Sequence, residues 1–600
     1  MASREVEVSG QLVRLCIEAA CESRDSVERW RRQRRTLERL PSPIADALLG
    51  RLLCRRLVYP SFLELFKFTV EHIDLSGENY VDEKWMVYLG AFRYLRSLNI
   101  ADCYRITSSA LWHLAGMTSL RELDLSRCMK LTDAGIEHLL SIPHLEKLCI
   151  SETSATAGSI KLLSSLANLS TLDLGGLPVS DLALSSLQVL TKLEYLDVWG
   201  SKISDKVAAT FLKFIKLSYL NLAWTKITKF PVMKSLECLN MSNCSINSVI
   251  KENCDKAPLR KLVFHGSSFT DAAEVFSHID AGFLSFLDLS NTIIDNFGFL
   301  HRLHKLEHLD LSFTMVDDNS VELIACVGEH LRHLNLSMTK ISSLGMEILA
   351  GNVPLLEVMT LSHTIIDDVA IAYISMMPSL GILDLSYTNI RGYTNQPDHD
   401  QARVLSLPAL QNLEHLKKLD LSGTRILDLA LYPLSSFKEL SHLSLLNASL
   451  TDDCLPHLSS ICKLVDLSIH DALLSDHALH SFKPPATLKV LDLRGCWLLT
   501  GDAVRLFCRN HPQLEVIFDL HMPLDMATGS NICTSSSRSS PQILKSKRQG
   551  VKSSISRSRF REDILDQRMK YSREELLSLQ HSSPSSPHNL RLEAQALTRR

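Results

Sequence analysis

The sequence lacks the short motifs by which many enzymes are recognised. It contains no Gly-x-x-x-x-Gly-Lys-Ser/Thr loop for phosphate, no Gly-x-Ser-x-Gly turn for a nucleophilic serine and no His-Glu-x-x-His motif for zinc. Its 23 histidines are scattered along the chain, and none is paired by spacing with a candidate nucleophile. We therefore expect a protein that is not an enzyme and that uses no cofactor.

Targeting signals and membrane spans are also missing. The first residues show no basic stretch followed by an apolar run, so we expect no signal peptide. No window of 18 residues is apolar throughout, so we expect no membrane-spanning helix. The 15 cysteines include no Cys-x-x-Cys pair and no zinc-like spacing with histidine, which favours reduced, buried thiols and no bound metal. These absences predict a cytoplasmic or nuclear protein, neither secreted nor bound to a membrane.

The net charge of −3 is small but unevenly distributed. Residues 523–600 carry 14 Lys and Arg against 7 Asp and Glu, so this segment is basic and the rest of the chain is acidic. An acidic body is repelled by the phosphate backbone of nucleic acids. We expect no nucleic-acid partner.

The dominant feature of the chain is one pattern, Leu-x-x-Leu-x-Leu, which occurs 19 times between residues 70 and 522. Most copies begin 24 or 25 residues after the previous one, and the clearest is Leu120-Arg-Glu-Leu-Asp-Leu-Ser-Arg-Cys128. Side chains alternate along a strand, so each Leu-x-Leu directs two leucines to the same side. Neighbouring copies can bury these leucines only by stacking in parallel, which builds a solenoid.

The segment after each frame completes the repeat. Eight residues beyond the frame start, most copies have a Cys or Thr that can hydrogen-bond local backbone, and a helix pattern such as residues 132–139 follows. The repeats resemble the cysteine-containing leucine-rich repeats of ribonuclease-inhibitor-like proteins. That resemblance implies an α/β leucine-rich-repeat solenoid, or horseshoe, with a parallel sheet on its concave side.

Residues 1–69 do not fit the repeat, and we expect them to form a helical cap over the end of the leucine core. Leu12-Val-Arg-Leu-Cys16 opens an amphipathic helix pattern, and residues 40–57 form a second one that proline begins. Leu12-x-x-x-Cys16 is similar to an elongin-C-binding box. Leu40-Pro41-x-x-Ile44-x-x-x-Leu48 is similar to the cullin-contacting box that follows it.

Together, and directly before leucine-rich repeats, these boxes resemble the von Hippel–Lindau box of the Zyg-eleven/Zer-one family. The resemblance implies a substrate-recognition subunit of a cullin–RING ubiquitin ligase that contacts elongin B and C and a cullin. The docking residues would be Leu12, Cys16, Leu40, Pro41, Ile44 and Leu48. That family ends in an armadillo-like domain that reads substrate N-termini, whereas this chain has further leucine-rich repeats, so the substrate preference does not carry over.

Other interpretations of the same residues stay open. Leu12, Cys16 and residues 40–57 would also suit the buried face of a cap with no docking role, and the Leu-Pro opening also resembles an F-box, which would imply an F-box-type adaptor. A leucine-rich-repeat scaffold without a ubiquitin role is the main alternative function. A GTPase activator of the leucine-rich type is a third, although such repeats are usually longer.

Positions two, four and six after the frame start face away from the leucine core and form the concave surface, with position seven at its rim. Position four is mostly Asp or Asn, which we interpret as part of the repeat scaffold. Large aromatic and histidine side chains at the other positions are typical of interface anchors, so they predict a binding site for a protein target. They are Tyr195, Trp199, Tyr219, Trp224, Phe286, His308, Phe313, His333, His363 and Tyr387. Alternatively, Trp199 and Trp224 simply stack on each other.

Two irregular steps interrupt the repeats. Residues 228–231 leave no length for a helix, so we expect extended chain there, and residues 391–401 are polar and turn-rich, which predicts a protruding loop. From residue 523 onward the chain is Ser-rich and basic, and we expect a disordered tail.

Overall fold

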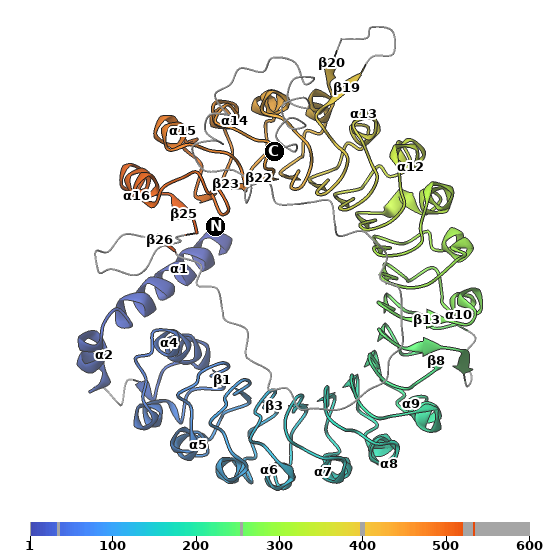
Figure 1. Ribbon diagram of the computed structural model, residues 1–600. Coiled ribbons are helices and arrows are strands. Elements are labelled where there is room, and N and C mark those ends of the chain that lie inside the picture. Colours follow the sequence, from blue (N-terminus) through green and yellow to red (C-terminus); the bar gives the residue numbers. More distant parts are fainter. Residues whose placement is uncertain (1, 33–36, 252–255, 396–402, 520–531, 534–600) are drawn as a thin grey trace, which may run out of the picture. The chain divides into compact units, whose positions relative to one another are not determined.

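The computed structural model describes residues 2–32, 37–251, 256–395, 403–519 and 532–533. The chain forms two compact units, residues 1–315 and residues 316–600. Within each unit, short strands line one side of the repeats and helical turns lie on the other (Figure 1).

In the first unit the strands pair in parallel, each with the strand of the next repeat, and Leu172 of one strand faces Leu196 of the next. Every strand covers positions two to four of its frame. They are β1 (His72–Asp74), β2 (Ser97–Asn99), β3 (Glu122–Asp124), β4 (Lys147–Cys149), β5 (Thr171–Asp173), β6 (Tyr195–Asp197), β7 (Tyr219–Asn221), β9 (Cys238–Asn240), β12 (Lys261–Val263), β14 (Phe286–Asp288) and β15 (His308–Asp310).

The second unit repeats this arrangement. Its strands are β16 (His333–Asn335), β17 (Val358–Thr360), β18 (Ile382–Asp384), β21 (Lys418–Asp420), β22 (His442–Leu446), β23 (Asp466–His470), β24 (Val490–Asp492) and β25 (Glu515–Ile517). They also pair in parallel in sequence order. The strand register that the leucine frame predicts is therefore confirmed in both units.

The leucine frame forms the core. In the repeat that begins at Leu193, the side chains of Leu193, Leu196 and Val198 are fully buried, and the equivalent positions of other repeats are buried as well. Burying one such side chain stabilises the fold by about 1.5–3 kcal/mol. The strands are only a few residues long, so this stacked apolar column holds them together more than their own hydrogen bonds do.

The turn after each strand is held by the side chain at position eight, in one of two ways. The Thr364 hydroxyl donates a hydrogen bond at 2.7 Å to the carbonyl of Leu361, the residue directly after its own strand. Cys128 instead donates to the carbonyl of Ile100, in the preceding repeat, at 3.2 Å. Thr residues therefore close their own repeat and Cys residues tie two repeats together. Burial raises the pKa of Cys128 to about 11, which keeps this thiol protonated as a donor.

The opposite side of the repeats is formed by short helices. In the first unit these are α5 (Glu83–Leu89), η2 (Ser108–Leu114), α6 (Asp133–Leu139), α7 (Ala157–Leu162), η3 (Leu163–Ser165), α8 (Asp181–Ser186), η4 (Leu187–Val189), η5 (Asp205–Val207), α9 (Ala208–Phe211), α10 (Ala272–Ser277) and η6 (Gly298–Arg302). In the second they are η7 (Asp318–Ser320), α11 (Val321–Ala325), η8 (Gly328–His330), α12 (Ser343–Leu349), α13 (Val369–Ile374), η9 (Leu407–Asn412), η10 (Asp428–Ser436), α14 (Cys454–Ser459), α15 (Asp476–Ser481) and α16 (Gly501–Asn510).

A carboxylate at the start of several helices links one repeat to the next. Asp476 accepts hydrogen bonds from both the backbone N–H and the hydroxyl of Thr500, at 2.7 and 2.8 Å. Asp181 does the same with Ser204, at 2.8 Å for both bonds. These carboxylates satisfy backbone donors that a helix start leaves unpaired, so they stabilise both the helix and the stacking.

The irregular steps behave largely as the sequence predicts. Extended chain replaces a helix in β8 (Lys229–Val232), which pairs in parallel with β11 (Ser248–Lys251), while β10 (Ser245–Ile246) pairs with β13 (Ser268–Phe269). The extended conformation expected at residues 228–231 is thus confirmed. At the insertion, β19 (Tyr393–Asn395) and β20 (Arg403–Leu405) pair antiparallel, and the intervening part of the predicted loop lies outside the described residues.

The N-terminal segment is helical, as predicted. It contains α1 (Ala2–Ala20), α2 (Arg24–Arg31), α4 (Ser42–Cys54) and η1 (Pro60–Phe66). Its core includes Leu49, Leu52, Phe62 and Phe66, all nearly fully buried. Most of the predicted disordered tail lies outside the described residues, but β26 (Ile532–Cys533) falls within it and pairs in parallel with β25.

The position-eight hydrogen bond can be tested with an isosteric substitution. Thr364→Val keeps the shape of a buried side chain but leaves the Leu361 carbonyl without this donor, so the free energy of unfolding should fall by about 1–2 kcal/mol. Thr360→Val, in the same repeat but half-buried on β17, is the matched control and should change it by less than about 0.5 kcal/mol. Urea unfolding measures both, and equal effects would refute the role of the hydroxyl.

Candidate functional site

The C-terminal half of α1 is fastened to the rest of the cap by polar contacts. Glu18 accepts hydrogen bonds from Arg51 at 2.9 Å and from Arg55 at 2.6 Å, both at the end of α4. Arg55 also donates to the carbonyl of Cys21 at 2.7 Å, and the indole N–H of Trp30 donates to the carbonyl of Ala20 at 3.0 Å. These contacts set the direction in which α1 leaves the cap.

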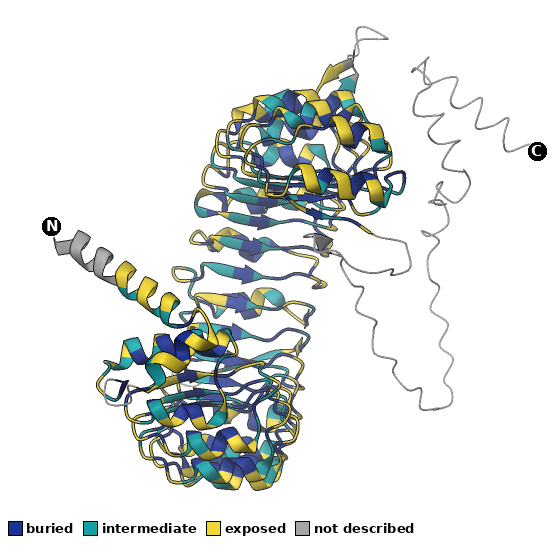
Figure 2. Cartoon of the chain, turned by 90° about the vertical axis from the view of Figure 1, so that its left-hand side faces the viewer, coloured by how far each residue is buried: buried dark blue, intermediate teal, exposed yellow. Residues whose placement is uncertain are grey.

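The preceding turns of α1 present apolar side chains to solvent. Leu12 and Leu15 are 62% and 63% exposed, and Cys16 is exposed as well. Residues separated by three and four positions are neighbours on a helix surface, so these three side chains form one stripe. Figure 2 shows exposed residues along α1 where it projects from the cap. The alternative in which Leu12 and Cys16 form the buried face of the cap does not agree with this exposure.

The predicted cullin-contacting residues lie at the start of α4, and their exposure differs. Pro41 is exposed, Leu40 and Ile44 are half-buried, and Leu48 is 6% exposed and packed within the cap. A partner could therefore reach Leu40, Pro41 and Ile44, while Leu48 holds the helix in place.

The open face of the sheet in the first unit carries two pairs of stacked rings. Tyr195 and Tyr219 are register partners on β6 and β7, with ring centroids 4.1 Å apart and an interplanar angle of 7°. Phe286 and His308 stack in the same way on β14 and β15, at 4.1 Å and 5°. The Lys261 ammonium lies over the Phe286 ring at 4.5 Å. Position two thus carries two stacked ring pairs, and Cys238 and Lys261 occupy this position between them.

The two tryptophans do not stack on each other in the described part of the chain. Trp199 lies at position six, where its indole covers Gly175 of the preceding repeat, since a Cβ on Gly175 would be only 2.1 Å from Trp199 Nε1. Trp224 lies at position seven with φ +58°, which turns its side chain outward, and it is 64% exposed. The stacking alternative is therefore wrong because the two residues occupy different frame positions. Phe313 shares the position and the exposed setting of Trp224.

The remaining predicted residues belong to the second unit. His363 and Tyr387 stack at position seven, with centroids 4.3 Å apart and an angle of 5°, and the Tyr387 ring covers Gly423 of the next repeat. His333, the first residue of β16, lies at position two of its frame and is half-buried. The second unit therefore has its own aromatic pair at the rim.

The Asp and Asn residues at position four have a structural role. In each case one side-chain oxygen accepts the backbone N–H two residues further on, as Asp124 does from Ser126 at 2.9 Å and Asp384 from Ser386 at 2.9 Å. The scaffold interpretation of this row agrees with that geometry. Among the described residues, no group of three His, Cys, Asp or Glu side chains could hold a metal ion.

Two of these carboxyl groups have pKa values above the ordinary value for aspartate. Burial raises the pKa of Asp197 to about 6, although hydrogen bonds from the Trp199 backbone and the Asn221 amide oppose the shift. Burial also raises the pKa of Asp173, against hydrogen bonds from Gly175 and Ser151, and nearby carboxylates add to the effect.

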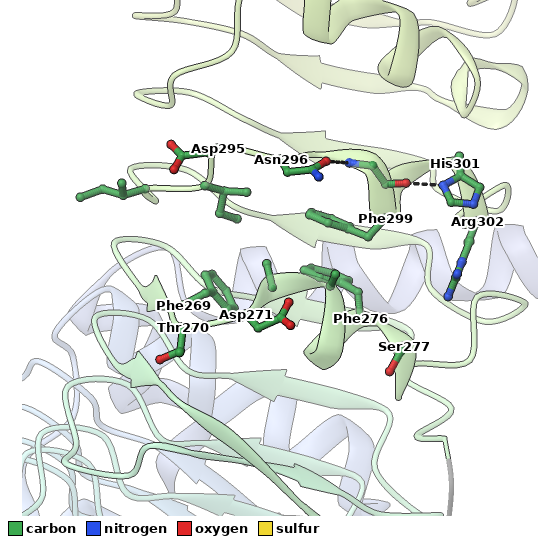
Figure 3. A pocket seen from close by; sticks show the side chains of 15 residues that line it. Phe269, Thr270, Asp271, Phe276, Ser277, Asp295, Asn296, Phe299, His301 and Arg302 are labelled. Atoms are coloured by element: carbon green, nitrogen blue, oxygen red, sulfur yellow. Dashed lines mark hydrogen bonds between the residues drawn. The ribbon is translucent and has the colours of Figure 1, made fainter.

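A pocket of about 370 Å³ lies on the helical side, between α10 and η6 (Figure 3). Its floor includes Phe276 and Phe299, whose rings stack at 3.9 Å. Asn296 accepts the N–H of Gly298 at 2.7 Å at its rim. The pocket contains none of the predicted site residues. Among the described helices, none is long and apolar enough to span a membrane.

Three contributing residues were not predicted. Leu15 completes the exposed stripe of α1, and its spacing of three from Leu12 would have revealed it. Gly175 and Glu152 lie beside Trp199, since a Cβ on Gly176 would approach Glu152 Cγ to 3.0 Å and the indole to 3.5 Å. Most repeats have Ser or Ala at position six, so the glycine at position 175 was the sequence signal for a special role.

Comparison with known proteins identifies the repeat. A sequence model of the family described as "Leucine Rich repeat" matches residues 116–140 and 329–350. The sequence matches none of the curated proteins with which it was compared. Together with the strand register, the matched segments show that the chain is built from leucine-rich repeats.

Solved structures with similar repeats include an internalin from Listeria monocytogenes, with 20% identity, 55% of this chain and 88% of that chain covered, and a TM-score of 0.40. The plant peptide hormone receptor RGFR1, in complex with RGF2, has 17% identity, coverages of 77% and 72%, and a TM-score of 0.38. A leucine-rich-repeat protein of Leptospira interrogans has 16% identity, coverages of 75% and 95%, and a TM-score of 0.37.

The shifted carboxyl predicts a pH dependence of stability. Because the pKa of Asp197 rises from an ordinary 3.8 to about 6 on folding, its contribution is fully present below pH 3.8 and is lost as the pH rises through 6. From this group alone, the free energy of unfolding should fall by about 2 kcal/mol between pH 4 and pH 7. The difference between the wild type and Asp197→Asn, measured by urea unfolding, isolates that change.

An exposed aspartate provides the control. Asp295→Asn, on the helical side, removes a carboxylate at an exposed position and controls for the loss of the charge itself. A difference between wild type and Asp197→Asn that stays constant from pH 4 to pH 7 would contradict the raised pKa.

Proposed function

We propose that this protein is the substrate-recognition subunit of a cullin–RING ubiquitin ligase, with α1 as its adaptor-docking helix and the open sheet face as its target-binding surface. The leucine-rich repeats support the general role of a protein-interaction module. The exposed stripe of Leu12, Leu15 and Cys16 is the observation that supports the docking role.

An exposed apolar stripe on an anchored helix needs an explanation. Exposed leucine side chains gain no burial within their own chain, and a stripe at i, i+3 and i+4 is how a helix occupies a groove on a partner. Glu18 and its two arginine partners hold the other end of α1, so the stripe is presented in a defined direction. A rigid docking helix loses less conformational entropy on binding than a flexible segment would.

The ligase role assigns separate tasks to the cap and the repeats. The cap binds elongin B and C through α1 and a cullin through Leu40, Pro41 and Ile44. The sheet face holds the target close to the ubiquitin-loaded enzyme, so the chain contributes proximity and supplies no catalytic group. Such a protein would act in the cytoplasm or the nucleus. A scaffold without a ubiquitin role would need the sheet face only.

Adaptor binding is the test. Co-expression with elongin B and C should give a complex that co-elutes in size-exclusion chromatography, and the Leu12→Ala, Cys16→Ala variant should lose it. Both side chains are exposed, so the variant should keep the stability of the wild type to within about 0.5 kcal/mol.

The matched control is Leu182→Ala with Cys462→Ala, which removes an exposed leucine and an exposed cysteine elsewhere on the chain and should leave co-elution unchanged. If the folded wild type binds neither elongin B and C nor an F-box-type adaptor, the ligase role is wrong and the scaffold role stands.

A further inference from the structure

The first unit has an aromatic and acidic patch across the repeats of β4, β5, β6 and β7, which we call the Trp199 patch. It consists of Glu152, Asp173, Tyr195, Asp197, Trp199 and Tyr219. The stacked tyrosines lie at position two, the two aspartates at position four and Trp199 at position six. An acidic strip therefore separates aromatic surfaces at the two ends of these strands.

The indole of Trp199 packs against Gly175 and Gly176 of the preceding repeat. A Cβ on Gly175 would clash with Nε1 at 2.1 Å and with Cδ1 at 2.4 Å, so only glycine lets the ring lie here. The neighbouring Gly176, with φ +72°, separates the benzene edge of the indole from the Glu152 side chain. One face of the ring is covered by backbone and the residue is only half-buried, so the remaining surface of the ring is open to a partner.

The charges around this ring are negative and poorly compensated. Arg127, one repeat before Glu152, directs two hydrogen bonds, both 2.6 Å, to Asp102, and its charge acts on Glu152 without an ion pair between them. Lys147 forms its ion pair with Glu122 at 2.7 Å. Among the described residues, no Lys or Arg forms an ion pair with Glu152, Asp173 or Asp197. Burial and mutual repulsion raise the pKa of Asp173, as expected where carboxylates lack a cation.

We infer that the Trp199 patch binds an arginine side chain in an extended segment of the partner, with the guanidinium stacked on the indole and directed toward Glu152. A flat guanidinium combines stacking with a fork of donors suited to a carboxylate, and a cation over an aromatic face is attracted by the ring itself. The acidic patch supplies the complementary charge. This inference rests on the sheet face being the target-binding surface, as proposed above.

The probe is the labelled peptide acetyl-Gly-Ser-Arg-Gly-Ser-Arg-Gly-Ser-amide, titrated with the full-length chain by fluorescence polarisation. A second peptide has citrulline in place of both arginines and keeps their shape without the charge. We expect the arginine peptide to bind, the citrulline peptide to bind at least about fivefold more weakly, and Trp199→Ala and Glu152→Gln each to weaken the arginine peptide by about fivefold. Gly175→Ala, which displaces the indole but removes no charge, should act like Trp199→Ala.

Two variants control for general effects. Trp112→Ala removes a tryptophan that is 66% exposed on the helical side, and Glu137→Gln removes an exposed charge there, so both should bind like the wild type. Equal affinity of all variants, or of both peptides, would overturn the inference. Adaptor co-elution depends on α1 and is measured separately on the same variants, so failure here is distinguishable from failure of the ligase role.

Discussion

In the repeats with Asp or Asn at position four, a side-chain oxygen of that residue accepts the backbone N–H two residues on and fixes the turn out of the strand. The residue after that donor adopts a positive φ in almost every repeat, as Trp224 and Phe313 do, and its side chain is directed to the rim. The same hydrogen bond occupies the Asp and Asn side chains along the sheet. One oxygen of each of these side chains is therefore committed to folding, while the charge of Asp173 and Asp197 still contributes to the Trp199 patch.

The fold could be predicted because its cause is periodic. A Leu-x-x-Leu-x-Leu frame can bury its leucines only if successive copies stack in register, so the frame starts predict where each strand of the leucine repeats lies, although β22 and β23 run two residues longer than the others. The extended segment at β8 followed from length alone, since no helix fits in the short step. The sequence also shows which repeats have Thr and which have Cys at position eight. It does not show that the two side chains bond to different repeats. Only packing shows that Cys128 reaches the carbonyl of Ile100 in the preceding repeat, as the hydroxyl of Ser267 also does toward Met241.

The candidate sites were less predictable, because the same residue types occur in the core and at binding surfaces. The spacing of Leu12 and Cys16 suits both a buried helix face and an exposed docking stripe. Whether these side chains are buried or exposed depends on which side of α1 faces α4, and the contacts of Glu18 fix that side. The alternative in which Trp199 and Trp224 stack on each other failed because a difference of one frame position changes the direction of the side chain. Gly175 leaves the space in which the Trp199 indole packs. Its own repeat does not reveal this role, because the ring belongs to the next repeat.

Thiol labelling of the native chain tests the central claim, that α1 presents a free docking stripe, most directly. Mass spectrometry after a short pulse of iodoacetamide should find Cys16 modified as fast as the exposed Cys326 and Cys462, while the buried Cys103 and Cys496 stay unmodified. Saturating elongin B and C should protect Cys16 alone. A Cys16 thiol that reacts as slowly as the buried ones, or that reacts equally fast with and without the adaptor, would contradict the account.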